Sequence, residues 1–461
     1  MSGAILRSVL AGRAAWWAPA LVASLSSLLV GICLVQTLGT DATNPEIQAV
    51  LRSEGLETDH VASVGLSLSV MMLPIIVIVL ATVSSAAITA TTPDRARWRL
   101  AGAPPSMLAL FVLLEIVLVS LAGGVLGALG TALLGGPLSG LLNRLILPEL
   151  AGIEVQPAPL ALLGAAVVPP LTALVAGLLP ALRGARVPAI RALRGESEPS
   201  GRHSGRRGVI TGLGLCALCA AVVLTYRRPP VLEGGQALTA GLGLAVLTLV
   251  VAGLGARTLV PLIVRAVSRL LPVPGAVWPL AGDGAVARAH VSGATVVALA
   301  CGTGILGALT GMARTSEAIS RALGSHEDYN LLDTYVICGV IGLLCAVGGA
   351  CVLALSAGDR RREVATLRAA GMAPSQVRGA AAVEALLLTA ASMVISLATT
   401  LMSTGLITRA AAVEGLPARL TLPWPELAVA GALTAAVLLA ALVLPAQRAL
   451  GASVRGSLAP G

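Results

Sequence analysis

Lysine is absent from this sequence, and all 31 of its basic residues are therefore arginine. A Walker A loop needs a lysine to contact nucleotide phosphates, so the chain cannot bind and hydrolyse ATP through such a loop. Charged residues of either sign are also scarce, at 11% of 461 residues, whereas hydrophobic residues make up 56%. A soluble protein of this length could not bury so much apolar surface, and we expect an all-α polytopic membrane protein.

The sequence also lacks the usual signatures of a hydrolase or a metal protein. It contains no His-Glu-x-x-His motif and no recognisable Ser/His/Asp set. Its four histidines are scattered without ligand spacing, so we predict no metal and no cofactor in this chain. Cys216 and Cys219 have a redox-like spacing, but they fall inside a predicted membrane span, where cysteine usually packs as a small apolar residue.

Ten apolar segments are long enough to cross the roughly 30 Å hydrocarbon layer of a bilayer. The first follows Arg7 and Arg13 and is too long for the core of a cleaved signal peptide. We predict membrane spans at about 15–38, 64–90, 107–134, 158–181, 208–226, 236–264, 290–312, 332–357, 379–407 and 425–447.

Arginine is distributed unevenly among the segments that connect these spans. With the N-terminus inside, most arginines fall on the inner side, notably in 183–207 and 360–362. Inner loops of membrane proteins carry such an excess, so we predict both termini inside, with Arg227 and Arg228 as the main exception. The excess of arginine in the inner segments accounts for the net charge of +9, so we predict no nucleic-acid partner.

One segment of the chain occurs twice. Residues 94–122 and 363–391 align at a constant offset of 269, and in each a short polar stretch leads into an apolar run. The matched pairs include Asp94 and Glu363, Arg99 and Arg368, Gly102 and Gly371, and Glu115 and Glu384. A repeat of this length predicts two copies of one membrane unit, which is a common design among transporters.

The repeat divides the ten predicted spans into groups of four, two and four. Each group of four begins and ends inside, so the two copies have parallel topology. The longest outer loops, at about 39–62 and 135–157, are too short for a folded external domain. We predict a first four-helix repeat at 1–195, a cytoplasmic linker at 196–207, an extra two-helix hairpin at 208–280 and a second four-helix repeat at 281–461.

The segment 358–387, GDRRREVATLRAAGMAPSQVRGAAAVEALL, resembles the signature of FtsX-like (MacB-type) ABC transporter permeases. In that pattern a charged Arg/Glu stretch leads through Arg-Ala-x-Gly to an apolar helix that contains a glutamate. The first copy departs from it, because Thr92 and Pro93 stand where the second has Arg361 and Arg362. The resemblance implies a permease with two FtsX-like repeats in one chain. It also implies a separate ABC ATPase, expected to be a dimer, which would bind ATP and Mg²⁺.

The two matched polar segments are the candidate ATPase-coupling sites. A short helix in each would lie along the membrane face with its charges in water, and a glycine would end it. The charges could instead be ordinary inner-side anchors, but the match between the two copies favours a functional role. We predict that each segment docks on one ATPase protomer through Asp94, Arg97, Arg99 and Gly102 in the first copy and Arg361, Arg362, Glu363, Arg368 and Gly371 in the second.

Glu115 and Glu384 lie about two helical turns inside matching spans. An ionised carboxylate at that depth costs several kcal/mol unless it is paired or hydrated. The two glutamates could form a gating pair between the halves, or they could be hydrogen-bonded packing residues.

The resemblance implies export or extraction of a hydrophobic or amphipathic compound, such as an antimicrobial peptide, an antibiotic or a lipid, across a bacterial plasma membrane. Two alternatives stay open. The chain could instead transmit ATPase motion to an extracellular cell-wall enzyme or sensor. It could also be an ion-coupled secondary transporter that uses Glu115 and Glu384, although two coupling segments would then have no role.

Overall fold

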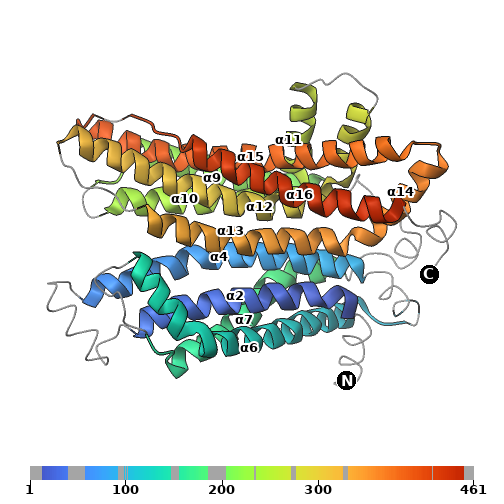
Figure 1. Cartoon of the computed structure of the whole chain (residues 1–461), viewed down its shortest axis with the longest axis horizontal. Helices are drawn as coiled ribbons and strands as arrows, with labels where there is room; N and C mark the ends of the chain where they lie inside the picture. Colours follow the sequence, from blue (N-terminus) through green and yellow to red (C-terminus); the bar gives the residue numbers. More distant parts are fainter. Residues whose placement is uncertain are drawn as a thin grey trace. The chain divides into compact units, whose positions relative to one another are not determined.

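The computed structural model describes residues 13–39, 58–91, 98, 100, 102–146, 155–184, 204–232, 235–270, 277–324, 331–417 and 419–450. These residues are almost entirely helical and include no strand (Figure 1). The chain forms two compact units, Met1–Glu198 and Pro199–Gly461. Ten helices within the described ranges are long and apolar enough to cross a membrane, as the sequence predicts.

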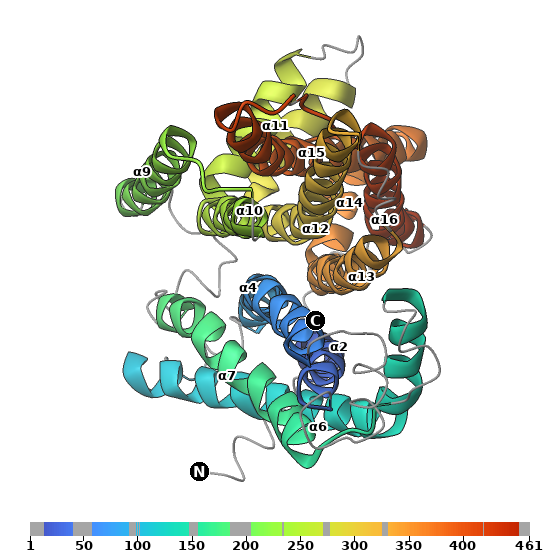
Figure 2. The same ribbon diagram turned by 90° about the vertical axis from the view of Figure 1, so that its left-hand side faces the viewer.

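The first unit contains four long helices. They are α2 (Arg13–Gly39), α4 (Thr58–Ala90), α6 (Pro105–Ile146) and α7 (Pro159–Gly184). Helix α2 packs against each of the other three, and α7 also contacts α4 and α6 (Figure 2). Each helix is rich in Leu, Val and Ala and presents one side to its neighbours, while many leucines remain on the outer surface, as expected of helices that face lipid.

Small residues allow α2 and α6 to approach closely. A side chain at Gly123 would lie 2.6 Å from the carbonyl oxygen of Ala20, so only glycine fits at this contact. Nearby, the hydroxyl of Ser27 contacts the carbonyl oxygens of Gly124 and Ala165, at 2.8 Å each. This one serine therefore contacts the backbones of α6 and α7 from α2.

The second unit is larger and contains eight helices among its described residues. They are α9 (Ser204–Arg227), α10 (Gln236–Leu254), α11 (Ala256–Leu270), α12 (Val277–Ala322), α13 (Leu332–Leu355), α14 (Ala357–Ala369), α15 (Pro374–Val413) and α16 (Trp424–Leu450). Helix α12 is central and contacts α10, α11, α13, α15 and α16. Helix α9 lies at the edge, and its Cys216 and Cys219 are exposed there, not packed in a core.

Helices α12 and α15 form the closest pair of the second unit. Gly307 of α12 lies directly against the Thr400 hydroxyl of α15, and the Thr303 and Ser396 hydroxyl groups meet one turn away. The first unit has the same contact between Gly31 and Thr131. Thr131 and Thr400 are 269 residues apart, so the sequence repeat corresponds to a repeated helix contact.

Several helices, such as α12 and α15, extend beyond the predicted spans at both ends, and two further boundaries differ in kind. Helix α6 continues through Pro137 to Ile146, so the first part of the predicted outer loop 135–157 is helical. The predicted span 236–264 is interrupted at Gly255, whose carbonyl oxygen accepts the N–H of Leu259 at 2.7 Å and begins α11. The predicted linker 196–207 lies largely outside the described residues, but its last four residues already belong to α9.

Candidate functional site

Helix α14 is the short charged helix that precedes α15. It ends at Ala369, and Gly371 follows with φ of 90°, a left-handed conformation that favours glycine. The N–H of Met372 donates to the carbonyl oxygen of Leu367 at 3.1 Å, and that of Gly371 donates to Arg368 at 3.0 Å. These bonds satisfy carbonyl groups that a helix end leaves without partners.

The start of α15 completes this turn. Pro374 occupies the first turn of the helix, where the missing N–H of proline is tolerated. The side chain of Gln376 accepts the N–H of Ala373 at 3.0 Å and so caps the helix. The chain therefore reverses tightly between α14 and α15.

One side of α14 packs onto the membrane helices. Val364 and Leu367 join an apolar cluster with Val377 and Ala381 of α15 and Ala446 of α16. The guanidinium of Arg368 donates to the carbonyl oxygen of Leu450 at 3.0 Å, at the C-terminus of α16. A cation is favourable at that end of a helix. Arg368 thus holds α14 against α16.

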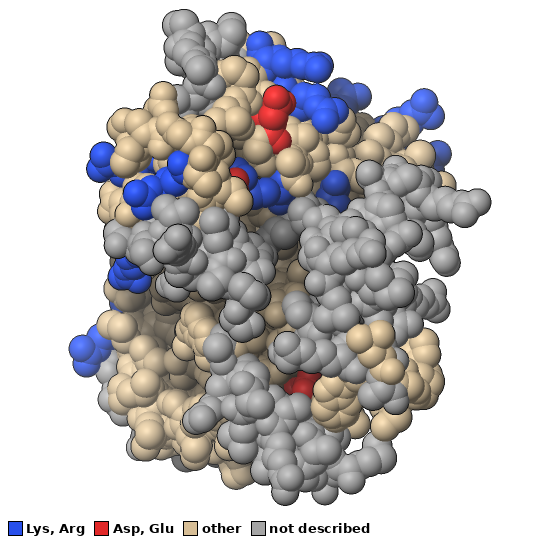
Figure 3. All heavy atoms as spheres, turned by 90° about the vertical axis from the view of Figure 1, so that its right-hand side faces the viewer, with Lys and Arg blue, Asp and Glu red and all other residues tan. Residues whose placement is uncertain are grey.

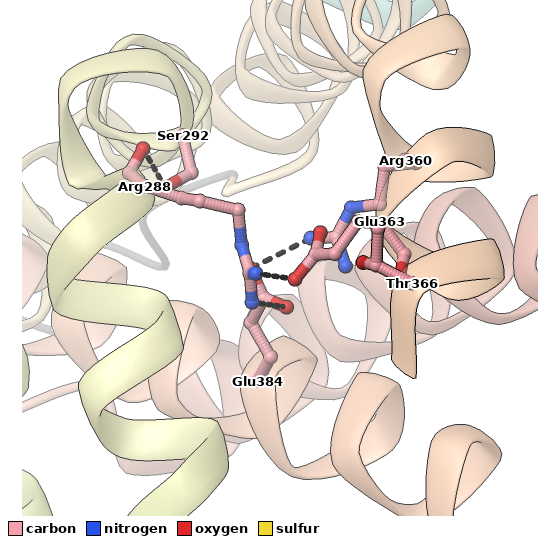
Figure 4. A network of polar contacts seen from close by, with 6 residues as sticks. All are labelled: Arg288, Ser292, Arg360, Glu363, Thr366 and Glu384. Atoms are coloured by element: carbon pink, nitrogen blue, oxygen red, sulfur yellow. Dashed lines mark hydrogen bonds and ion pairs between the residues drawn. The ribbon is translucent and has the colours of Figure 1, made fainter. Parts of the chain in front are cut away.

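A charged network links α14 to α12 and α15 around Glu384 (Figure 4). Arg288 of α12 binds the Glu384 carboxylate with two nitrogens, Nη2 to Oε2 at 2.7 Å and Nε to Oε1 at 3.2 Å. Arg360 of α14 donates to the same Oε1 at 2.6 Å. Arg288 also pairs with Glu363 of α14. These four residues are called the Glu384 network below.

Burial makes this network energetically important. The side chain of Glu384 is only 1% exposed, and that of Arg360 is 14% exposed. A buried charge is strongly destabilising without a partner, and a two-nitrogen contact from arginine fixes geometry as well as charge. Two arginines face two carboxylates here, so the charges of the network compensate one another. The network joins three helices into one polar junction.

The sequence analysis identified Glu363 and Glu384 but missed Arg288 and Arg360 as their partners. Arg288 is 96 residues from Glu384 in the sequence, so no local pattern connects the two residues. A signal was present, because a buried carboxylate requires cations, and both arginines flank predicted spans at the same membrane side.

The first copy repeats the turn and differs at one position of the network. Gly102 has φ of 93°, and the N–H of Ala103 donates to the Trp98 carbonyl oxygen at 3.2 Å. This bond matches the one between Met372 and Leu367 at an offset of 269. The residue equivalent to Arg360 is Thr91, whose hydroxyl donates to the Ala87 carbonyl oxygen at 2.8 Å.

Glu115 is buried in α6, as Glu384 is buried in α15. A gating pair between these two residues stays a prediction, since each belongs to a different unit. Several predicted coupling residues cannot be placed. Asp94, Arg97 and Arg99 lie outside the described residues, and the same holds for the side chains of Arg361 and Arg362.

Most residues around Gly371 are exposed. We call residues 369–378, the end of α14, the turn and the start of α15, the coupling turn. Its exposed members are Ala369, Ala370, Gly371, Ala373, Pro374, Ser375, Gln376 and Arg378. Figure 1 places α14 at one end of the long helices, and the view onto that end in Figure 3 shows far more arginine than acidic surface among the coloured residues.

A second polar cluster lies near the other end of α12. Glu426 of α16 pairs with Arg314 of α12 and accepts the hydroxyl of Tyr335 from α13 at 2.7 Å. The Glu426 side chain is 8% exposed. The sequence analysis missed this cluster, because three helices distant in sequence supply one residue each.

The fold and the repeated turns define an all-α multi-pass membrane protein that contains two related sets of helices. The family model for the FtsX-like permease C-terminal domain matches residues 66–189 and 335–454, together more than half of the chain. The chain therefore belongs to the FtsX-like permease family. This membership indicates the permease subunit of an ABC transporter, a transport component whose family generally pairs with an ABC ATPase. A comparison with curated proteins found no significant match.

Proposed function

We propose that this chain is the membrane subunit of an ATP-driven transporter of the bacterial plasma membrane, and that an ATPase dimer docks on its two glycine turns. The observation that carries the proposal is the construction of α14. The C-terminal end of α14 leads into the exposed coupling turn. The side of α14 that faces the other helices is joined to α12, α15 and α16 by apolar packing and by the Glu384 network.

This construction suits the transmission of movement. A partner that pushes on the coupling turn would displace α14 as a rigid helix, because Arg368 and the apolar cluster hold it on α16. Arg360 and Glu363 would pass that displacement to Glu384 and Arg288, and so to α15 and α12. Arg288 and Arg314 lie toward opposite ends of α12, so the helix connects the network to the second polar cluster.

The proposed docking residues differ from those expected from sequence. Glu363 and Arg368 were expected to contact the ATPase, but both make contacts within the chain. We therefore assign the ATPase contact to the exposed coupling turn, and to Gly102–Ser106 in the first copy, where Pro104, Pro105 and Ser106 are exposed. Glu363 and Arg368 are positioning residues for α14.

The transported compound is proposed to be hydrophobic or amphipathic. The ion-coupled alternative receives less support, since both oxygens of Glu384 accept hydrogen bonds from guanidinium groups. Those bonds occupy the positions that a transported cation would need. The alternative function, signalling to an external enzyme, would use the same ATPase contact. A substrate-transport assay distinguishes it from export.

The test is co-purification of the chain with the candidate ATPase encoded nearby. Ala370→Trp places a bulky side chain on the exposed coupling turn, and Ala412→Trp places the same group on an exposed site near the other end of α15. The proposal predicts that the first variant loses the ATPase and the second retains it. Retention of the ATPase by both variants, or loss by both, would contradict the assignment of the coupling turn.

A further inference from the structure

Helix α11 and the beginning of α12 form a helical hairpin that crosses the direction of the long helices. In Figures 1 and 2 it stands out sideways from the bundle of the second unit. A hydrogen bond connects the two arms of the hairpin, α11 and the beginning of α12. The Trp278 Nε1 donates to the Ser268 carbonyl oxygen at 3.1 Å. Gly282 faces Ser268 as well, since a side chain at this glycine would lie 3.4 Å from the Ser268 Cβ.

This hairpin lies beside the membrane spans but belongs to none of them. The candidate span of α12 begins at Ser292, and α11 is not among the spans found in the described residues. The candidate spans cross the membrane along the long helices, so a hairpin that stands out sideways from them would extend along the membrane plane (Figure 1). Ala256 packs against Gly293 at the start of the span, which places the base of the hairpin near the membrane boundary.

The two sides of α11 differ in character. Ala256, Val260 and Val264 are buried against the bundle at a spacing of four residues. The opposite side carries Leu262, Arg265 and Arg269 at helical spacing, and all three are exposed. Leu262 is 58% exposed and Leu270, at the tip, is 79% exposed.

This exposed stripe matches the boundary of a bilayer that contains anionic lipid. Leucines that water would disfavour can enter the upper acyl region, while arginines beside them reach the phosphate groups. Guanidinium groups bind phosphate oxygens with two nitrogens at once. Asp283 is an exposed acid on the second arm and the described hairpin offers few others, so positive charge prevails on its surface.

We propose that α11 lies in the membrane interface and binds anionic phospholipid headgroups through Arg265 and Arg269. The partner is thus a lipid surface of defined charge, and the interaction does not depend on ATPase docking. Arg288 lies on the second arm of the same hairpin. Lipid bound to α11 would therefore also hold the arm that supplies the central arginine of the Glu384 network.

Trp278 provides a reporter within the hairpin. The other tryptophans, Trp16, Trp17, Trp98 and Trp424, are replaced by phenylalanine, and the full chain is placed in nanodiscs. Phosphatidylglycerol or phosphatidylcholine brominated in the upper acyl chain is then added at equal mole fraction. Each arginine near an anionic surface contributes roughly fivefold to association. We expect half-maximal quenching of Trp278 at a several-fold lower fraction of the anionic lipid.

Arg265→Gln combined with Arg269→Gln should make the two lipids quench equally. The matched control is Arg409→Gln with Arg419→Gln, which removes two exposed arginines elsewhere and should preserve the difference. Equal quenching by both lipids in the parent chain would overturn the lipid preference. Absence of quenching by either lipid would overturn the interfacial position of the hairpin. The comparison of the two lipids in the parent chain uses no arginine variant. It therefore tests the proposal even if a variant fails to fold.

Discussion

At the scale of single residues, Glu384 is the most constrained charge that the structure describes in the second unit. Three bonds from two arginines reach its carboxylate, which is almost fully buried. Removing one partner of a buried ion pair leaves the other charge without compensation, whereas replacing both by neutral groups can be nearly neutral in stability. The two types of substitution therefore have different expected effects.

The first prediction concerns this coupling. Arg288→Gln or Glu384→Gln alone should destabilise the chain by about 1–3 kcal/mol, because each breaks the two-nitrogen contact and leaves one charge of the network without compensation. The double variant should lose less than the sum of the two. Thermal unfolding of the purified chain in detergent measures all three. Strictly additive losses would show that the pair does not act as a unit.

The pair Glu317 and Arg321, of which Glu317 is 17% exposed, is the control for this cycle. The two residues lie one helical turn apart on α12, and the Arg321 side chain is 65% exposed. Pairs of this kind contribute about 0.5 kcal/mol or less. Their neutral replacement should therefore leave the unfolding temperature nearly unchanged.

The second residue-scale prediction concerns Gly371. Its left-handed backbone costs any other residue roughly 1–2 kcal/mol, so Gly371→Ala should lower the unfolding temperature. Gly358→Ala is the matched control, since Gly358 lies within α14 and has open space around it. Alanine favours a helix over glycine, and this change should be neutral or slightly stabilising. Equal effects of the two substitutions would contradict the role assigned to the turn.

At the scale of elements, the pairing of α12 with α15 depends on glycines that admit hydroxyl groups of the facing helix. Gly311 adjoins Thr404 as Gly307 adjoins Thr400. In a membrane such small-residue contacts replace the hydrophobic driving force that water would provide. The closeness of the two helices also brings Arg288 within reach of Glu384, so the packing positions the network.

The third prediction tests this packing. Gly307→Val should reduce the yield of folded protein and the unfolding temperature, because the added side chain would overlap Thr400 and Leu427. Overpacking of this kind costs typically about 1–3 kcal/mol. Gly339→Val on α13 has open space and should be tolerated. Unfolding curves that coincide for the two variants would refute the proposed constraint.

At the scale of the whole molecule, much of the fold could be predicted from the sequence. Long apolar runs identify the ten spans, and the constant offset between Gly102 and Gly371 identifies the repeat. Periodicity could not locate the break at Gly255, because apolar residues lie on both sides of it. It also ended α6 too early, because Gly135, Gly136 and Pro137 have the composition of a loop although the helix continues through them.

The candidate site was less predictable. Glu384 stood out as a charge in an apolar run, but its partner Arg288 is determined by helix packing between segments 96 residues apart. The packing of α14 on α16 likewise determines which residues face outward. It exposes the coupling turn and engages Arg368 in a contact within the chain. The two copies share the turn and differ at Thr91 and Arg360, so duplication alone could not reveal how each turn is joined to the neighbouring helices.

The central claim is that the Glu384 network transmits ATPase movement to the membrane helices. The most direct measurement is ATP hydrolysis by the ATPase complex in lipid, comparing the parent with the Arg288→Gln/Glu384→Gln double variant, which removes the charges and leaves the coupling turn intact. We predict normal complex formation with a loss of permease-dependent stimulation of about 5-fold or more, the usual lower range of coupling between sites. Full stimulation in the double variant would contradict it.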